Sequence, residues 1–206
     1  MNLTVKPYHH GNLADAILQR AAQTIAEEGL EALSLRGIAR DLGVSHAAPN
    51  RHFKNKSALL TALAADAWGK LQQAVLGAAD AVESDSAHRR LNAMGRGYLH
   101  WALNNKAMFR AIYHPDVGRY ATPELTAAIS RFSDVVKEAV LQTQAEGRHP
   151  NVPSHLLTIY TNAVPTGAAL LMLDPLVSKE FETSEEQEVV IAQVIDLVVP
   201  LDGLDD

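Results

Sequence analysis

The 206-residue chain contains no cysteine. Without thiols it can form neither a disulfide bond nor a thiolate metal site. It also lacks an uninterrupted apolar run of about 18 residues, the length that a membrane-spanning helix needs. Its polar first dozen residues are unlike a signal peptide. We therefore expect a soluble protein in the cytoplasm, with no membrane partner.

The sequence also lacks the short motifs of the common enzyme classes. It has no glycine-rich phosphate loop, no His-Glu-x-x-His motif and no serine nucleophile elbow. The nine histidines are scattered along the chain. A metal-sensing variant that uses His100, His114 or His155 stays open as an alternative. We predict a binding protein rather than an enzyme, with no catalytic residues, no cofactor and no resident metal.

Strand patterns are absent too. Apolar residues recur at helical spacing, and no segment shows sustained alternation between turn dipeptides. The sequence predicts an all-α fold of about nine helices. Turn residues such as His114-Pro115-Asp116 separate the later segments. These later helices are expected from residue 57 into the early 80s and over 86–104, 106–113, 123–146, 153–173 and 184–199.

Residues 34–53 have the pattern of two short helices joined by a tight turn. Ser34 can cap the first helix, and Gly43 follows where the chain must turn left-handed. Ser45 can then cap a second helix that ends at Phe53. This order predicts a helix-turn-helix. Four apolar residues at helical spacing form one stripe on the first helix: Leu35, Ile38, Ala39 and Leu42.

Helices on both sides of this motif complete a small domain. Upstream, Asn12 can cap an apolar helix with an acidic residue in its first turn. Downstream, Asn55 or Ser57 can cap a long segment whose leucines face inward. Three helices around one core predict a compact head over residues 1–70. Residues 71–206 are then predicted to form a larger helical domain.

The stretches Ala16–Gly29, Leu33–Ser45 and His52–Leu60 resemble the DNA-binding domain of the tetracycline-repressor (TetR) family of bacterial transcriptional regulators. In that family the segment that matches residues 34–53 is the helix-turn-helix, and the helix that matches residues 45–53 is the recognition helix. The resemblance implies binding to a double-stranded DNA operator. The residues predicted to contact the DNA are Ser34, Leu35, Arg36, Ser45, His46, Ala47, Pro49, Asn50, His52 and Lys56.

One of these positions departs from the family pattern. The family usually has Tyr where this chain has Asn50, and the Tyr hydroxyl commonly contacts a phosphate. Asn50 can still donate to a phosphate, or it can pair with adenine if it faces the groove. The contact made at this position therefore stays open.

Charge divides unevenly along the chain. Residues 1–70 hold eight Lys or Arg against six Asp or Glu, whereas residues 71–206 hold ten against eighteen. The whole chain has a net charge of −6. DNA would be attracted to the mildly basic head and repelled by the acidic remainder.

The last two long helices are more apolar than one buried face requires. We predict that they form the interface of a symmetric homodimer. The alternative is that both helices lie in the centre of a monomer. Dimerisation also suits the head, because two recognition helices must lie about 34 to 36 Å apart to contact successive major grooves. Pro165 is expected to kink the first of these helices.

Aromatic residues make up only 5% of the chain, and many of them gather in its middle. Within the family this part usually encloses an effector pocket. Gly97–Leu103 followed by Ala107–Arg110 resembles one C-terminal subfamily, which is named for Trp, His and Gly residues. The resemblance implies a small-molecule effector, and the residues expected to bind it are Tyr98, Trp101, Phe109, Tyr113, Phe132 and Tyr160.

These features predict a homodimeric transcriptional repressor that leaves a palindromic operator when a small molecule enters its helical core. One alternative is a DNA-binding regulator that needs no ligand. Another is a helical small-molecule binding protein whose DNA-binding head is degenerate, for which Asn50 is the hint.

Overall fold

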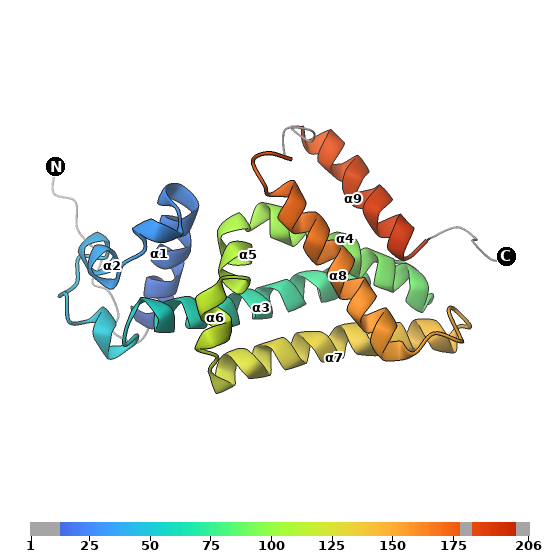
Figure 1. Cartoon of the computed structure of the whole chain (residues 1–206), viewed down its shortest axis with the longest axis horizontal. Coiled ribbons are helices and arrows are strands. Elements are labelled where there is room, and N and C mark those ends of the chain that lie inside the picture. The colour runs from blue at the N-terminus through green and yellow to red at the C-terminus, as the bar shows by residue number, and fades with distance from the viewer. Residues whose placement is uncertain (1–12, 178–182, 201–206) are drawn as a thin grey trace. The chain divides into compact units, whose positions relative to one another are not determined.

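The computed structural model describes residues 13–177 and 183–200, and all of the regular elements among them are helices (Figure 1). The predicted all-α fold is confirmed. Asn12, the expected first cap, lies outside the described residues. Two short 3-10 helices, η2 (Leu30–Ala32) and η3 (Pro49–Arg51), lie on either side of α2. The α-helices are α1 (Leu13–Glu28), α2 (Leu35–Asp41), α3 (Lys56–Asp80), α4 (Ala87–Asn104), α5 (Lys106–Ile112), α6 (Pro115–Arg119), α7 (Pro123–Ala145), α8 (Ser154–Met172) and α9 (Ser184–Val198).

The described residues group into two compact units. The first holds residues 13–65 and 107–125, and the second holds 66–106 and the described part of 126–200. Most of α5 and the whole of α6 therefore group with the N-terminal helices. The functional boundary expected near residue 70 stays a prediction.

The core of the first unit is built from the apolar stripes of three helices. Each Leu or Ile side chain buried there contributes about 1.5 to 3 kcal/mol to folding. Almost completely buried side chains in these three helices include Ile17 and Ala21 of α1, Ile38 and Ala39 of α2, and Leu59, Leu60 and Leu63 of α3.

Both ends of α2 match the prediction. The Ser34 hydroxyl accepts a hydrogen bond from the Gly37 N–H at 3.1 Å and so caps the helix. After the helix, Gly43 has a φ of 66°. This left-handed conformation is unfavourable for side chains with a Cβ, which explains glycine at the turn.

The segment expected to be the recognition helix, residues 45–53, is not a regular α-helix. Residues 46–48 form a turn in which the Ala48 N–H donates to the Ser45 carbonyl at 2.9 Å, and η3 follows. Pro49 gives the physical reason. Because proline has no N–H, it cannot donate to the Ser45 carbonyl four residues earlier. The segment therefore forms hydrogen bonds between residues three apart, as in a 3-10 helix.

The helix α6 occupies a segment that the sequence pattern presents as a turn. His114 caps it, with its Nδ1 accepting from the Asp116 N–H at 3.2 Å. Pro115 takes the first helical position. An N–H at this position would have no acceptor within the helix, so proline loses no hydrogen bond there. A histidine cap lies outside the usual Ser, Thr, Asp and Asn set, so the start of this helix was missed.

In the second unit α4, α8 and α9 pack against one another (Figure 1). Leu91 and Leu99 of α4 are buried, as are Ile191 and Ile195 of α9. Helix α8 continues through Pro165 to Met172, and the kink expected at Pro165 stays a prediction.

Polar groups also join α4 to α9. The Asn92 amide nitrogen donates to the Asp196 carboxylate at 2.8 Å and to the Val199 carbonyl at 2.7 Å. Arg96 donates to the same carboxylate and to the Asn92 carboxamide oxygen, each at 2.8 Å. Asn92 is buried, so these bonds satisfy a group that would otherwise lose its contact with water.

Glu146, just after α7, accepts hydrogen bonds at the start of α4. Its carboxylate oxygens accept from the Ala87 N–H at 2.6 Å and from the His88 N–H at 3.1 Å. These amides belong to the first turn of α4, where they have no partner within the helix. The bond from Ala87, and then that from His88, lower the pKa of the Glu146 carboxyl. The contact ties the end of α7 to the beginning of α4.

Candidate nucleic-acid interface and ligand cavity

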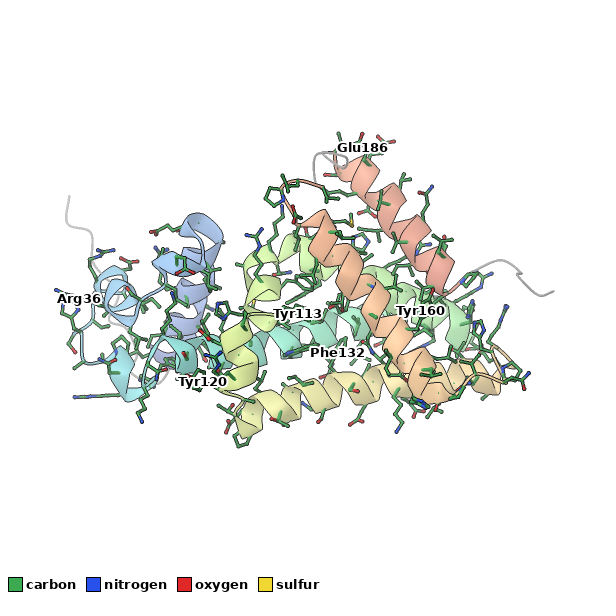
Figure 2. The ribbon with its side chains drawn as sticks, in the orientation of Figure 1. Arg36, Tyr113, Tyr120, Phe132, Tyr160 and Glu186 are labelled. Atoms are coloured by element: carbon green, nitrogen blue, oxygen red, sulfur yellow. The ribbon has the colours of Figure 1, made fainter. Side chains whose placement is uncertain are left out.

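Most of the residues predicted to contact DNA lie on the surface of the first unit. Arg36 is exposed on the outer side of α2 (Figure 2). A surface hollow of about 580 Å³ brings Ser34, Arg36 and His46 together. It also includes Arg40, which was not among the predicted contacts. The exposed members of the predicted set are Ser34, Arg36, Ser45, His46, Ala47, Asn50 and His52.

The other three predicted residues are less accessible. Pro49 is buried, so its ring packs inside the protein and is not available to DNA. Leu35 is half-buried. Lys56 is also half-buried, and its ammonium donates to the Leu30 carbonyl at 2.9 Å. That contact joins η2 to the start of α3, and its two residues are 26 positions apart in the sequence. A contact between residues so far apart cannot be predicted from local sequence spacing.

Asn50 has a local partner in addition to any contact with DNA. Its amide nitrogen donates to the His46 carbonyl at 3.3 Å. The bond spans the turn that leads into η3, and it holds the backbone of His46. Asn50 therefore contributes to the shape of the exposed segment.

Ion pairs fix the orientation of α2 on α1. Arg20 of α1 donates through Nε to the Asp41 carboxylate at 3.0 Å, and Arg40 pairs with the same carboxylate at 3.2 Å. The hydrogen bond from Arg20 is the main cause of a lowered pKa at Asp41. The Arg40 guanidinium is thus held beside the hollow that contains Arg36.

The six aromatic residues predicted to bind an effector do not form one site. Tyr98 and Phe132 line a small inner cavity, whereas Tyr160 lines a larger one. Figure 2 shows Phe132 on α7 and Tyr160 on α8. Trp101 is buried and lines neither cavity.

Phe109 and Tyr113 belong to the other compact unit. Their rings pack together with centroids 5.0 Å apart, and Phe109 is completely buried. Phe109 and Trp101 therefore serve as core side chains. Helical spacing alone could not separate core aromatics from those that line a cavity.

The inner cavity is too small for an effector. Its volume is about 30 Å³, which is enough for a single water molecule. Tyr98 shares a hydrogen bond of 2.9 Å with the Thr166 hydroxyl. Most of the remaining lining is apolar, including Leu91, Met94 and Val136.

The larger cavity, of about 740 Å³, is within the usual range for small-molecule sites. Its walls come from the start of α4, the end of α7 with the loop that follows it, the first half of α8 and the end of α9. It shares Leu91, Thr161, Val198 and Val199 with the inner cavity, so the two are adjacent.

Large apolar side chains are exposed on α8 and α9. Ile159 is 63% exposed and Leu197 is 81% exposed. Both helices are thus apolar on their outward sides, unlike helices at the centre of a monomer. The exposed residues on α8 are Leu156, Ile159, Tyr160, Leu170 and Leu171, and those on α9 are Val189 and Leu197.

Within the described ranges, no helix is long and apolar enough to cross a membrane. The same ranges contain no group of three or more His, Cys, Asp or Glu residues placed to hold a metal ion. His100, His114 and His155 are therefore not part of such a group.

Two family models match the chain. The model described as "Bacterial regulatory proteins, tetR family" matches residues 17–63. The model described as "Tetracyclin repressor-like, C-terminal domain" matches residues 91–198, just over half of the chain. The second match does not confirm the subfamily named for Trp, His and Gly.

Curated relatives are named as transcriptional regulators. The HTH-type transcriptional regulator Rv1816 of Mycobacterium tuberculosis is 33% identical over 115 residues, which cover 55% of this chain and 49% of the relative. The HTH-type transcriptional regulator BetI of Klebsiella pneumoniae is 35% identical over 95 residues, which cover 46% of this chain and 47% of the relative. The chain thus spans about half the length of the curated relatives that it matches.

Solved structures share the fold over nearly the whole chain. A protein of unknown function from Rhodococcus sp. RHA1 has a TM-score of 0.77 at 28% identity, covering 94% of this chain and 97% of that one. A regulatory protein of the tetR family from Rhodococcus RHA1 has a TM-score of 0.70 at 21% identity, covering 94% and 98%. From its helix-turn-helix region and its matched C-terminal helices, the chain belongs to the tetR family of bacterial regulatory proteins, which are DNA-binding transcriptional regulators.

Proposed function

We propose that the chain is a homodimeric repressor that binds a palindromic operator in the bacterial cytoplasm and releases it when a small molecule enters the second unit. The observation that carries this proposal is that one chain has both a candidate DNA-binding surface and a cavity of the size of a small-molecule site. The first unit exposes Arg36 and His46 beside each other. The second contains a cavity of about 740 Å³.

The proposed dimer interface consists of the outward faces of α8 and α9. Contiguous exposed apolar surface is uncommon on soluble monomers, and it marks interaction sites. Two copies related by a twofold axis would bury these side chains against each other. The same symmetry would present two helix-turn-helix segments to the two halves of a palindrome.

Helix α3 supplies a route by which ligand binding can affect DNA binding. Its residues 56–65 belong to the first unit and its residues 66–80 to the second. A ligand that prefers one arrangement of the second unit would shift the population of dimers toward it. We propose that the favoured arrangement changes the spacing of the two heads, so that they no longer fit successive major grooves.

Operator binding can be measured by electrophoretic mobility shift with DNA from upstream of the chain's own gene. We expect a specific complex that requires dimers and dissociates when a ligand found by thermal shift is added. A tight complex that no stabilising ligand dissociates would indicate a ligand-independent regulator. The absence of any specific complex at low salt would indicate a degenerate head and would overturn the proposal.

A further inference from the structure

We propose that Arg40 contacts DNA and that the surface hollow beside α2 binds one phosphate of the DNA backbone through Arg36 and Arg40. The resemblance to the family did not place Arg40 among the predicted DNA contacts. This site rests on the DNA-binding part of the proposed function, but on neither the palindromic operator nor the effector.

Arg36 and Arg40 lie on the same face of α2, four residues apart. Residues at this helical spacing have Cβ atoms about 5–6 Å apart. Both arginines are exposed, and both line the hollow of about 580 Å³. Gly37 also lines it and has no side chain to fill the space. The two guanidinium groups can therefore reach one anion from the same side of the helix.

The charge of the hollow favours an anion. Its described lining residues include two arginines and the titratable His46, and none of them is Asp or Glu. Arg36 forms no ion pair with a residue that the structure describes. Residues 1–12, which precede α1, contain no Asp or Glu. A DNA phosphate suits this surface, because a guanidinium can donate two parallel N–H groups to phosphate oxygens.

Arg40 has N–H groups to spare although it pairs with Asp41. Its Nε and Nη2 atoms donate to one oxygen of the Asp41 carboxylate, each at 3.2 Å. Because a guanidinium has N–H groups on three nitrogens, both of those on Nη1 take no part in this pair. The Arg40 side chain is 78% exposed. Its outer edge can therefore donate to a phosphate while its other edge stays on Asp41.

Asp41 is acidic and adjacent to Arg40, so its charge must be offset if a phosphate is to bind nearby. Its second carboxylate oxygen accepts from Arg20 Nε of α1 at 3.0 Å. This bond is the main cause of the lowered pKa of Asp41, so the carboxylate stays ionised and paired. Asp41 thus bridges two arginines and anchors Arg40 to α1. Arg20 and Asp41 are positioning residues, because they act on DNA through Arg40.

Ser34 adds a donor to the same hollow. Its hydroxyl oxygen accepts from the Gly37 N–H at 3.1 Å, so its own O–H remains for donation. A Cβ at position 37 would lie 2.9 Å from this oxygen, so glycine there preserves the position of the hydroxyl. The hollow also includes His46, a predicted DNA contact. A phosphate held there would fix how the segment that carries His46 lies on the duplex.

The first test uses the full chain and a short DNA duplex of arbitrary sequence. Fluorescence anisotropy over a range of salt concentrations gives the slope of log affinity against log salt. Arg40→Gln should reduce the magnitude of this slope by about 0.9 for each DNA-binding unit bound, which is the value for one phosphate.

Arg119→Gln is the matched control and should leave the slope unchanged. Arg119 is 71% exposed and pairs with Asp116 in the same unit, but it does not line the hollow. An unchanged slope in Arg40→Gln would overturn the proposal, as would an equal reduction in the control.

The positioning role predicts a rescue. Arg20→Gln should weaken binding to the duplex at least threefold, because the Asp41 charge then acts on Arg40 alone. Adding Asp41→Asn should recover most of this loss. Adding Glu27→Gln is the control, since Glu27 also pairs with Arg20, at 3.3 Å, and the change in charge is the same. Equal recovery with both second substitutions would overturn the positioning role.

If Arg40→Gln fails to fold by circular dichroism, NMR of the arginine Nε–H groups gives the answer with unsubstituted protein. The duplex should shift the Arg36 and Arg40 signals and leave the Arg119 signal in place. Inorganic phosphate at the same phosphate concentration should shift them less. Equal shifts with inorganic phosphate would indicate a general anion site. That result would overturn the proposal, as would an unmoved Arg40 signal at saturating duplex.

These measurements need no operator, so the two proposals can fail independently. If Arg40→Gln reduces the salt slope but no specific operator complex forms, the phosphate site stands and the proposed repressor fails. If a specific complex forms but Arg40→Gln leaves the salt slope unchanged, the repressor stands and the phosphate site fails.

Discussion

The Lys56 side chain helps to hold the first unit together and also contributes to its positive charge. Its ammonium donates to the Leu30 carbonyl, so it links the start of α3 to η2. From the resemblance, Lys56 was predicted to contact the DNA. In the structure, part of the hydrogen-bonding capacity of Lys56 is used inside the protein.

Lys56→Ala should therefore lower both stability and DNA affinity. We expect a loss of about 1 kcal/mol in the free energy of unfolding, since the bond has a charged donor but is partly solvated. Urea unfolding measures the stability. Lys54→Ala is the matched control, because Lys54 is exposed. Equal stability of the two variants would show that the Leu30 contact contributes nothing.

His46 is the residue for which direct contact with base edges is expected. His46→Ala should reduce discrimination between the operator and its single-base variants by about 1 to 3 kcal/mol at the position contacted. Fluorescence anisotropy with a set of mutated operators measures it. Arg51→Ala, at a second exposed position, should instead weaken all of the DNAs alike and reduce the salt dependence. Identical profiles for both variants would contradict this assignment.

Phe109 was predicted to bind an effector, but it is completely buried beside Tyr113. Phe109→Ala should lower the free energy of unfolding by about 3 to 5 kcal/mol through the cavity that it leaves. Tyr113→Ala should cost less, because Tyr113 is 39% exposed. Chemical denaturation of both variants is the measurement. A fully stable Phe109→Ala protein that lost only ligand binding would restore the original assignment.

At the scale of elements, the regular spacing of apolar residues was sufficient to predict the long helices. The long helices α3, α4, α7, α8 and α9 all lie close to their predicted ranges. The errors fall where one residue overrides the pattern. Pro49 lacks the N–H that an α-helix over 45–53 needs as a donor. The start of α6 was not predicted, because its N-cap is a histidine, His114.

The candidate site was less predictable than the fold. Exposed residues of the helix-turn-helix followed from local sequence, because the motif is continuous. The large cavity instead combines segments that begin at His88 and end at Pro200. Only tertiary packing brings these segments together, so most of its lining residues carried no signal in the sequence.

The contact between Glu146 and α4 predicts a pH dependence of stability. Backbone hydrogen bonds lower the pKa of this carboxyl in the folded state. Its contribution is therefore complete above the ordinary pKa of 4.5 and is lost as the pH falls through the lower folded value. Glu146→Gln should unfold at a lower temperature than the unsubstituted chain at pH 7, and this difference should shrink below pH 4.5.

Differential scanning calorimetry across the pH range measures this difference. Glu138→Gln on α7, where Glu138 is exposed, is the control and should show a small difference at every pH. A Glu146→Gln deficit that stayed constant down to pH 3 would rule out the carboxylate as its cause.

At the scale of the whole molecule, assembly depends on the apolar faces of α8 and α9. Ile159→Asp places a charge at a position that is 63% exposed, so the protomer should still fold. Sedimentation velocity should show monomers, and operator affinity should fall at least tenfold. Ile129→Asp makes the same change on α7 at a position that is 41% exposed, and it should remain dimeric. A stable Ile159→Asp dimer would place the interface elsewhere.

The polar network between α4 and α9 has a consequence for how relatives of this chain diverge. Asn92, Arg96 and Asp196 satisfy one another across the two helices. A change at one of them alone leaves a buried or half-buried polar group without its partner. Among homologues we expect these three positions to change together, for example to an apolar set, while single replacements are rare.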